Sequence, residues 1–209
     1  MTDAGELTKE VEPRPVEIPF AGGVVHGQLW PGGSDWVVLL HEPGGDLDAW
    51  GELPGALAAD GYAALAVDLP GHGLSDDPWA SGRAVELVHA LAAFAKADGA
   101  SKVFVIAARE LATAAAVARN VDALVALSPP PFPIEGPEAT PPALVLVGGS
   151  DDDAVERANR FFRQTRGWAV MSSFGTEAQG TAIFASDWAE HALEQALGFL
   201  RDYRTNAGR

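Results

Sequence analysis

Short, continuous apolar runs recur along the chain and predict strands that are buried on both faces. They occupy residues 36–40, 63–67, 103–107, 123–127, 143–147 and 169–173. Before the first of them, residues 16–20 and 24–30 flank Ala21, Gly22 and Gly23, a pattern typical of an antiparallel hairpin. The folded part of the chain is therefore expected to begin with a hairpin and to continue into a sheet of buried strands.

The segments between these runs carry apolar side chains at helical spacing. Helices are expected at about residues 50–57, 81–97, 110–118 and 154–165, with a final helix from a Ser186 cap to about residue 203. Alternating strands and helices predict an α/β fold, in which helices cover both faces of a mostly parallel, twisted sheet. We expect one such domain over residues 16–205, without a cap domain, and a disordered arm over residues 1–15.

Composition and charge narrow the classes of partner. The chain has 209 residues, of which 47% are hydrophobic, and a net charge of −15. That charge repels phosphate backbones and anionic lipid surfaces, so neither nucleic acid nor a membrane is an expected partner. No apolar run approaches the roughly 18 residues of a membrane span, and the polar start resembles no signal peptide. A cytoplasmic location is therefore expected.

Few residues of the sequence are suited to hold a metal or cofactor. The chain has no cysteine, which excludes disulfides, thiol catalysis and cysteine-ligated metals. Its five histidines form no pair at ligand spacing, and no glycine motif that cradles phosphate precedes a helix. We therefore expect neither a metal nor a cofactor.

One stretch is specific enough to indicate a family. Residues 68–75 read DLPGHGLS, and the upstream residues 37–50 read VVLLHEPGGDLDAW. With these motifs, residues 16–203 resemble the α/β-hydrolase family. In that family the first motif is a structural turn, so His72 is expected to be structural. The proline-rich loop at residues 129–142 is where larger relatives insert a lid, which implies a compact, lid-less member.

The resemblance implies a serine at a sharp strand-to-helix elbow, a histidine base, an orienting acid and two backbone N–H donors. The family's elbow pattern aligns without gaps on residues 103–115. It places Ala107 and Leu111 on the outer glycines and Arg109 on the nucleophile. A guanidinium stays protonated and is no nucleophile. Leucine in place of the second glycine predicts that the turn has relaxed.

A shift of the elbow by one residue does not supply a serine. It would bring Ala108 or Glu110 to the nucleophile position. Glu110 would be a carboxylate nucleophile only if the elbow itself were shifted.

The resemblance also assigns the other two catalytic positions. Residues 148–151 read GGSD, which matches the family's G-x-x-D and puts Asp151 on the acid position. Residues 175–181 read GTEAQGT and put Gln179 on the histidine position. Glutamine accepts no proton near neutral pH, so general-base catalysis from this position is lost. Of the three catalytic side chains, only the acid is retained.

The oxyanion loop departs from the family as well. Counting without gaps from His41 to Trp50 places Glu42 on the family's glycine and Pro43 on the residue that donates its N–H. Proline has no N–H to donate. A shift of the loop would instead make Glu42 or Gly44 the donor. Glu110, which follows the nucleophile position, completes the oxyanion residues that the resemblance implies.

Three functions remain open. The first is a catalytically degenerate hydrolase, a pseudoenzyme that binds a small molecule or a protein. Arg109 at a helix N-terminus would then bind a carboxylate or phosphate. The simpler alternative is that Arg109 fills the vacated site and pairs with Asp151 or Glu42.

The second function is an enzyme with non-standard chemistry, in which His41 acts as an acid or base beside Asp151. The alternative for His41 is a histidine hydrogen-bonded to its own loop. The third function is an esterase-like hydrolase with a misassigned nucleophile, for which Ser75 and Ser128 are the candidates. Ser75 belongs to the structural turn, and no histidine is predicted beside Ser128.

Overall fold

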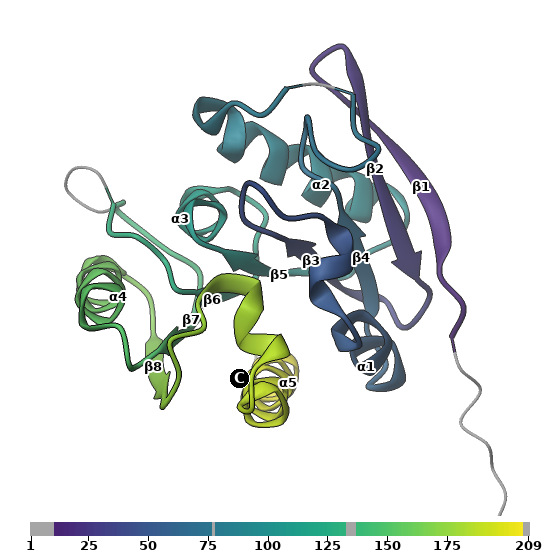
Figure 1. The fold of residues 1–209 in the computed structure, drawn as a ribbon. Helices are drawn as coiled ribbons and strands as arrows, with labels where there is room; N and C mark the ends of the chain where they lie inside the picture. Colours follow the sequence, from purple (N-terminus) through teal and green to yellow (C-terminus); the bar gives the residue numbers. More distant parts are fainter. Residues whose placement is uncertain (1–10, 77, 133–136, 207–209) are drawn as a thin grey trace, which may run out of the picture.

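A computed structural model describes residues 11–76, 78–132 and 137–206, and within them eight strands form one sheet in the order β1-β2-β4-β3-β5-β6-β7-β8 (Figure 1). β1 and β2 form the predicted antiparallel hairpin, β2 pairs antiparallel with β4, and all other neighbours are parallel. The strands are β1 (Arg14–Phe20), β2 (Gly23–Trp30), β3 (Asp35–Leu40), β4 (Ala63–Val67), β5 (Lys102–Ala108), β6 (Ala123–Leu127), β7 (Ala143–Gly148) and β8 (Ala169–Phe174). The expected α/β fold is confirmed.

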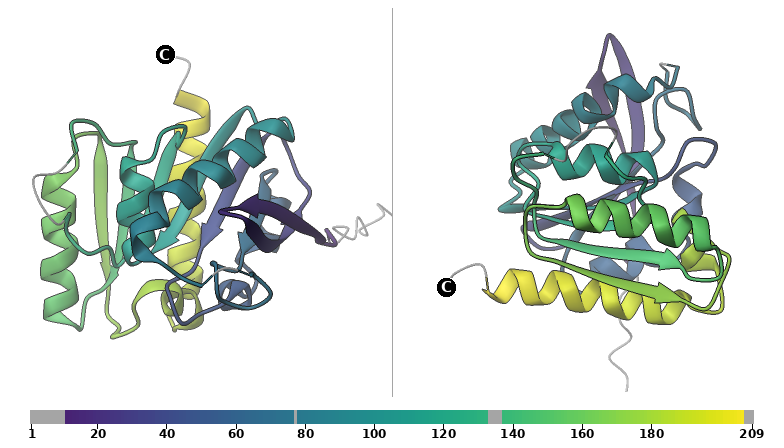
Figure 2. Two further views of the ribbon diagram at one scale, coloured as in Figure 1. Left: turned by 90° about the horizontal axis from the view of Figure 1, so that it is seen from above. Right: turned by 90° about the vertical axis from the view of Figure 1, so that its left-hand side faces the viewer.

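Helices cover both faces of the sheet, and side chains along each buried strand alternate between two cores. Val38 and Leu40 of β3 belong to the core on the side of α2, α3 and α4, whereas Val37 and Leu39 belong to the core on the side of α1 and α5. Figure 2 shows α4 and α5 on opposite sides of the strands. The helices are α1 (Leu53–Ala59), α2 (Ala84–Ala97), α3 (Glu110–Val117), α4 (Asp152–Gln164) and α5 (Ala189–Asn206), with short 3-10 helices η1 (Leu47–Trp50), η2 (Ser81–Arg83) and η3 (Gly180–Ala185).

The ends of the predicted elements differ from the structure by a few residues. β1 begins at Arg14, so the last two residues of the expected arm belong to the sheet. Residues 1–10 of that arm, and residues 133–136 of the proline-rich loop, lie outside the described residues. None of the described helices is long and apolar enough to cross a membrane.

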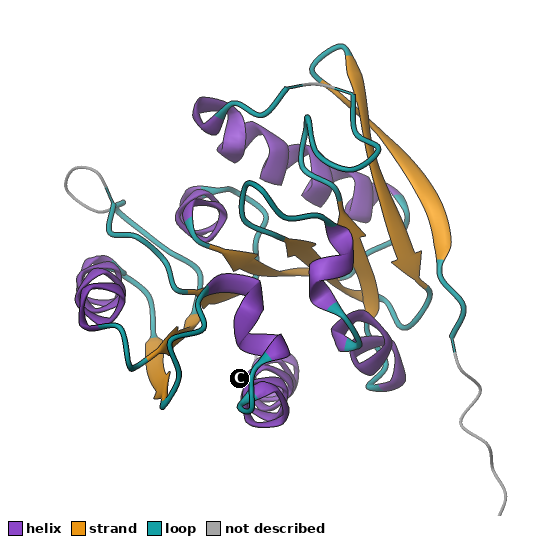
Figure 3. Cartoon of the chain, in the orientation of Figure 1, coloured by secondary structure: helices purple, strands orange, loops and turns teal. Residues whose placement is uncertain are grey.

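The parallel strands fix where a site can form. The carboxyl ends of β3, β5, β6, β7 and β8 meet at one edge of the sheet, because these strands run in the same direction. In open α/β sheets, ligands bind outside this edge. The loops that follow these strands (Figure 3) carry the residues that the sequence singles out, so the fold gathers them at one end of the molecule.

Candidate functional site

The turn between β5 and α3 is a strained strand-to-helix elbow, and Arg109 is its central residue. Arg109 has φ 53° and ψ −127°, and α3 begins at the next residue, Glu110. The Arg109 N–H donates to the carbonyl of Leu127 at 2.9 Å, which ties the elbow to the end of β6. A side chain in this backbone region costs about 1–3 kcal/mol. The sharp turn that normally presents a nucleophile is therefore present, with arginine on it.

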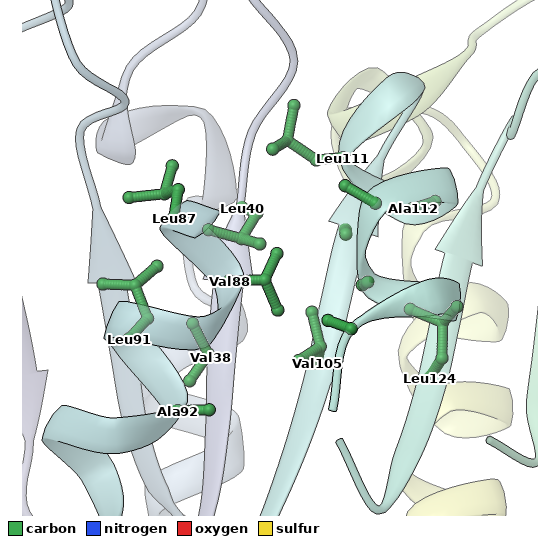
Figure 4. Packing of buried hydrophobic residues seen from close by; sticks show 14 of the residues in the cluster. Val38, Leu40, Leu87, Val88, Leu91, Ala92, Val105, Leu111, Ala112 and Leu124 are labelled. Carbon is green, nitrogen blue, oxygen red and sulfur yellow. The ribbon is translucent and has the colours of Figure 1, made fainter. Parts of the chain in front are cut away.

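The expectation of a relaxed turn is wrong, and the packing of its neighbours gives the reason. Ala107 and Leu111, at the two positions where the family has glycine, are fully buried. Leu111 belongs to the core that includes Leu87 and Val88 of α2 (Figure 4). The side chain of Leu111 therefore fills space between the sheet and α2, and the elbow keeps its shape without that glycine.

Gln179, predicted from the sequence to take the histidine position, is part of a buried hydrogen-bond network between strand ends. Its Oε1 accepts from the hydroxyl of Ser128 at 2.6 Å and from the N–H of Gly148 at 3.3 Å. Its Nε2 donates to the carbonyl of Gly148 at 2.9 Å. The Gly180 N–H in turn donates to the Ser128 hydroxyl at 3.1 Å. Gln179 thus fastens its loop to the ends of β6 and β7.

Asp151, predicted from the sequence to take the acid position, caps α4. Its Oδ1 accepts from the N–H of Ala154 at 3.0 Å, which is the usual role of an aspartate at this place in a helix. Asp151 lines an acidic hollow together with Ser150, Asp152, Asp153 and Glu177. Arg109 lines a different pocket, so the structure does not bring these two residues together in one cavity.

His41 is completely buried, and both of its ring nitrogens have partners. Nδ1 lies 2.8 Å from the carbonyl of Glu42, and Nε2 accepts from the N–H of Leu69 at 3.1 Å. The two bonds together require the neutral ring that carries its proton on Nδ1. Burial disfavours the charged form and lowers the pKa of His41 below its ordinary value. This geometry favours the interpretation of a histidine that is hydrogen-bonded to its own loop.

The loop after β3 offers few N–H groups to an oxyanion. Pro43 has none, and the N–H of Gly44 donates to Nε2 of His72 at 2.9 Å. The carboxylate of Glu42 accepts from the N–H of Thr181 at 3.3 Å and from its hydroxyl at 3.2 Å. Of the candidate donors on this loop, two are therefore excluded, and the Glu42 side chain is committed to Thr181.

The turn at residues 68–75 is hydrogen-bonded to this loop and supports it. The buried carboxylate of Asp68 accepts from the N–H groups of Leu47 and Leu74 at 2.9 and 3.0 Å. The Ser75 hydroxyl donates to the Asp68 carbonyl at 2.8 Å and accepts from the N–H of His26. Gly73 has φ 51°, and a Cβ there would lie 2.0 Å from an Asp68 oxygen. Both Ser75 and His72 therefore have structural roles in the geometry of this turn.

A pocket of about 440 Å³ opens at the elbow. It carries four charged side chains, those of Arg109, Arg157, Glu42 and Glu110, and is completed by Pro43, Ser128 and Pro130. Among the described residues, no carboxylate lies within 4.0 Å of either arginine. The expected pairing of Arg109 with Asp151 or Glu42 is therefore not formed.

Arg157 was missed by the reasoning from sequence. It lies in α4, far along the chain from the elbow, and belongs to no motif. Its place in the pocket depends on how α4 packs on the sheet beside β7, which residue spacing alone does not give. The sequence held one indication of this place. Arg157 lies early in the helix that Asp151 caps, and that helix begins just after the carboxyl end of a predicted strand, where sites form in this fold.

Solved structures with this fold include several hydrolases. An esterase from Exiguobacterium antarcticum has a TM-score of 0.75 at 15% identity, covering 90% of this chain and 100% of its own. A dienelactone hydrolase from Anabaena variabilis has a TM-score of 0.74 at 18% identity, covering 93% and 97%. A proline iminopeptidase from Mycobacterium smegmatis has a TM-score of 0.71 at 15% identity, covering 93% and 100%. These likenesses concern the fold.

No curated protein matches the sequence. The model of the alpha/beta hydrolase family, in contrast, matches residues 24–206, which is nearly the whole described domain. This match agrees with the strand order, the turn at residues 68–75 and the strained elbow at Arg109. The chain belongs to the alpha/beta hydrolase family.

Proposed function

We propose that this protein is a non-hydrolytic member of its family that binds a small anionic ligand at the elbow. The observation that carries the proposal is Arg109 itself. It occupies a strained backbone position, lines the pocket, and makes no ion pair within 4.0 Å among the described residues. A stored strain of this kind is expected where a side chain must be presented to a ligand.

The groups that the family's usual hydrolytic mechanism needs are not arranged for it at this site. Arginine stands in for the nucleophile, and the residue in place of the base is an amide that bonds Ser128 and Gly148. The acid position is used as a helix cap. The effects of removing catalytic residues that act as a unit do not add up. Loss of nucleophile and base together is therefore expected to lower the rate about as much as loss of either one, on the order of 10⁶-fold.

The charges around the pocket favour an anion. Arg109 and Arg157 both line it, and of its two carboxylate residues, Glu42 already accepts two hydrogen bonds from Thr181. Arginine presents a planar fork of donors that matches a carboxylate or a phosphate. In a chain with 29 acidic residues and 14 basic ones, two arginines that line the same cavity and form no ion pair within the described part of the chain leave positive charge available to a ligand of opposite charge.

The two enzymatic alternatives have less support. A role for His41 as acid or base conflicts with its burial and with the use of both ring nitrogens. A role for Ser128 as nucleophile needs a proton acceptor, and its hydroxyl donates to the oxygen of an amide instead. A protein partner at the pocket remains the alternative within the binding class.

The proposal predicts that small anions bind at the elbow and that binding depends on Arg109. Titration with acetate and with inorganic phosphate, followed by backbone amide NMR shifts, is expected to give saturable changes around Arg109 and Arg157. Arg109→Gln is expected to weaken binding by about tenfold or more, because a charge-assisted bidentate contact is lost. Glu110→Gln is expected to strengthen binding severalfold, because it removes a like charge.

Arg160→Gln is the matched control. Arg160 lies on α4 one turn from Arg157, is exposed, and does not line the pocket. The Arg160→Gln variant should bind acetate and inorganic phosphate with the same affinities as the wild type. Absence of saturable shifts with both anions, or an Arg109→Gln variant that binds like the wild type, would refute anion binding at this site.

A further inference from the structure

We infer that the ligand is an amphipathic carboxylate, with its anionic head at the arginines and an apolar chain along α3. The inference rests on the proposed function and adds the chemical class of the ligand. It comes from a second cavity that adjoins the elbow pocket and has a different character. The two cavities share Glu110 and Pro130 in their walls, so they lie side by side.

The second cavity is an apolar groove of about 510 Å³ that runs along one face of α3. Glu110, Thr113, Ala114 and Val117 line it at the spacing i, i+3, i+4 and i+7, which places them in a row along the helix. From Glu110 to Val117 this row is about 10 Å long, at the usual rise of about 1.5 Å per residue. The groove therefore leads directly away from the arginines.

Apart from Ser81, Glu110 and Thr113, the residues that line the groove are apolar. The start of α2 contributes Ala84 and Val85, and the loop after β6 contributes Pro131 and Phe132. The hydroxyl of Thr113 is already used, because it donates to the carbonyl of Pro130 at 3.1 Å. Polar ligand groups would find few partners here, and their desolvation would oppose binding.

Val117, at the far end of the row, is an exposed apolar side chain. Its exposed fraction is 38%, which makes it one of the few large apolar side chains exposed among the described residues. A chain that extends from the arginines would cover it, and burial of apolar area is favourable. A volume of this size and a concave shape between two helices and a loop fit a small molecule.

Octanoate and acetate are the probes that separate head from tail. Octanoate is expected to bind the wild-type protein about tenfold or more tightly than acetate, as measured by amide NMR titration, because its added methylenes leave water. Octanoate should also shift the amides of residues 113–117, and acetate should not. 1-Octanol, which has the same chain and no charge, should bind far more weakly than octanoate.

A pair of matched variants locates the chain. Val117→Gln is expected to reduce the affinity for octanoate severalfold and to leave that for acetate unchanged. Val170→Gln makes the same change at an exposed valine of β8 outside both cavities, and should alter neither affinity.

The outcomes distinguish the two proposals. Equal affinities for acetate and octanoate, both lost in Arg109→Gln, would overturn the amphipathic ligand and leave anion binding intact. Tighter binding of octanoate that Val117→Gln does not change, or octanol that binds as well as octanoate, would also overturn it. If neither acid nor inorganic phosphate binds, both proposals fail.

Discussion

Gln179→Leu is expected to lower the free energy of unfolding by about 2–4 kcal/mol, because it leaves buried polar groups without partners. Leucine fills a similar space but removes both the acceptor and the donor of the amide. The N–H and carbonyl of Gly148 and the hydroxyl of Ser128 then lose the bonds that Gln179 makes to them. Chemical denaturation with urea, followed by circular dichroism, measures the change.

Because Ser128 and Gln179 share a hydrogen bond, the losses of stability caused by substitutions at these two residues should not add up. Ser128→Ala alone should cost less than Gln179→Leu, and the double variant should cost less than the sum, because both remove the bond between the two residues. Gln195→Leu is the control, since Gln195 is exposed on α5 and its loss should cost no more than about 0.5 kcal/mol. A Gln179→Leu protein as stable as the wild type would contradict the structural role assigned to this position.

Arg109→Gly is expected to raise the free energy of unfolding by about 1 kcal/mol and at the same time to abolish anion binding. The φ of 53° and ψ of −127° at Arg109 are accessible to glycine without strain. Glycine also gives the unfolded chain more freedom, which offsets about 0.5–1 kcal/mol of the gain. The variant would then be more stable and inactive in binding, as expected where strain is retained for function.

Arg109→Ala separates strain from the loss of the side chain. Alanine removes the guanidinium but keeps a Cβ in the same backbone region, so binding should be lost without the gain in stability. Thermal and urea unfolding of the two variants and the wild type give the comparison. A glycine variant no more stable than the alanine variant would mean that the strain at the elbow is no larger than the about 0.5–1 kcal/mol that glycine's freedom in the unfolded chain costs.

The strands could be predicted from sequence because burial on both faces leaves a plain signal. The apolar runs at residues 63–67 and 123–127 are strands with the same ends in the structure. The hairpin was predicted from the glycines between two segments of strand-forming residues. The helices and their order were predicted from the spacing of apolar residues. The ends of other elements were less exact, as at Arg14, because a polar edge strand has no such signal.

The candidate site was predictable in position but not in conformation. The motif alignment brought Arg109, Gln179 and Asp151 to strand ends at one edge of the sheet. The strain at Arg109 was missed, because the rule that an elbow needs glycine at Leu111 ignores how a leucine there packs in the core. The bonds of Gln179 to Ser128 and Gly148, and the place of Arg157, depend on contacts between segments distant in sequence.

The proposed absence of serine-hydrolase chemistry is tested most directly by a fluorophosphonate probe, which labels activated serines. The folded protein is incubated with the probe beside an active serine hydrolase, and the intact mass of each is measured. We expect no change in mass for this protein and a stoichiometric adduct for the control. A stoichiometric adduct on this protein, above all one that maps to Ser128, would contradict the proposed loss of catalysis and reveal a working hydrolase.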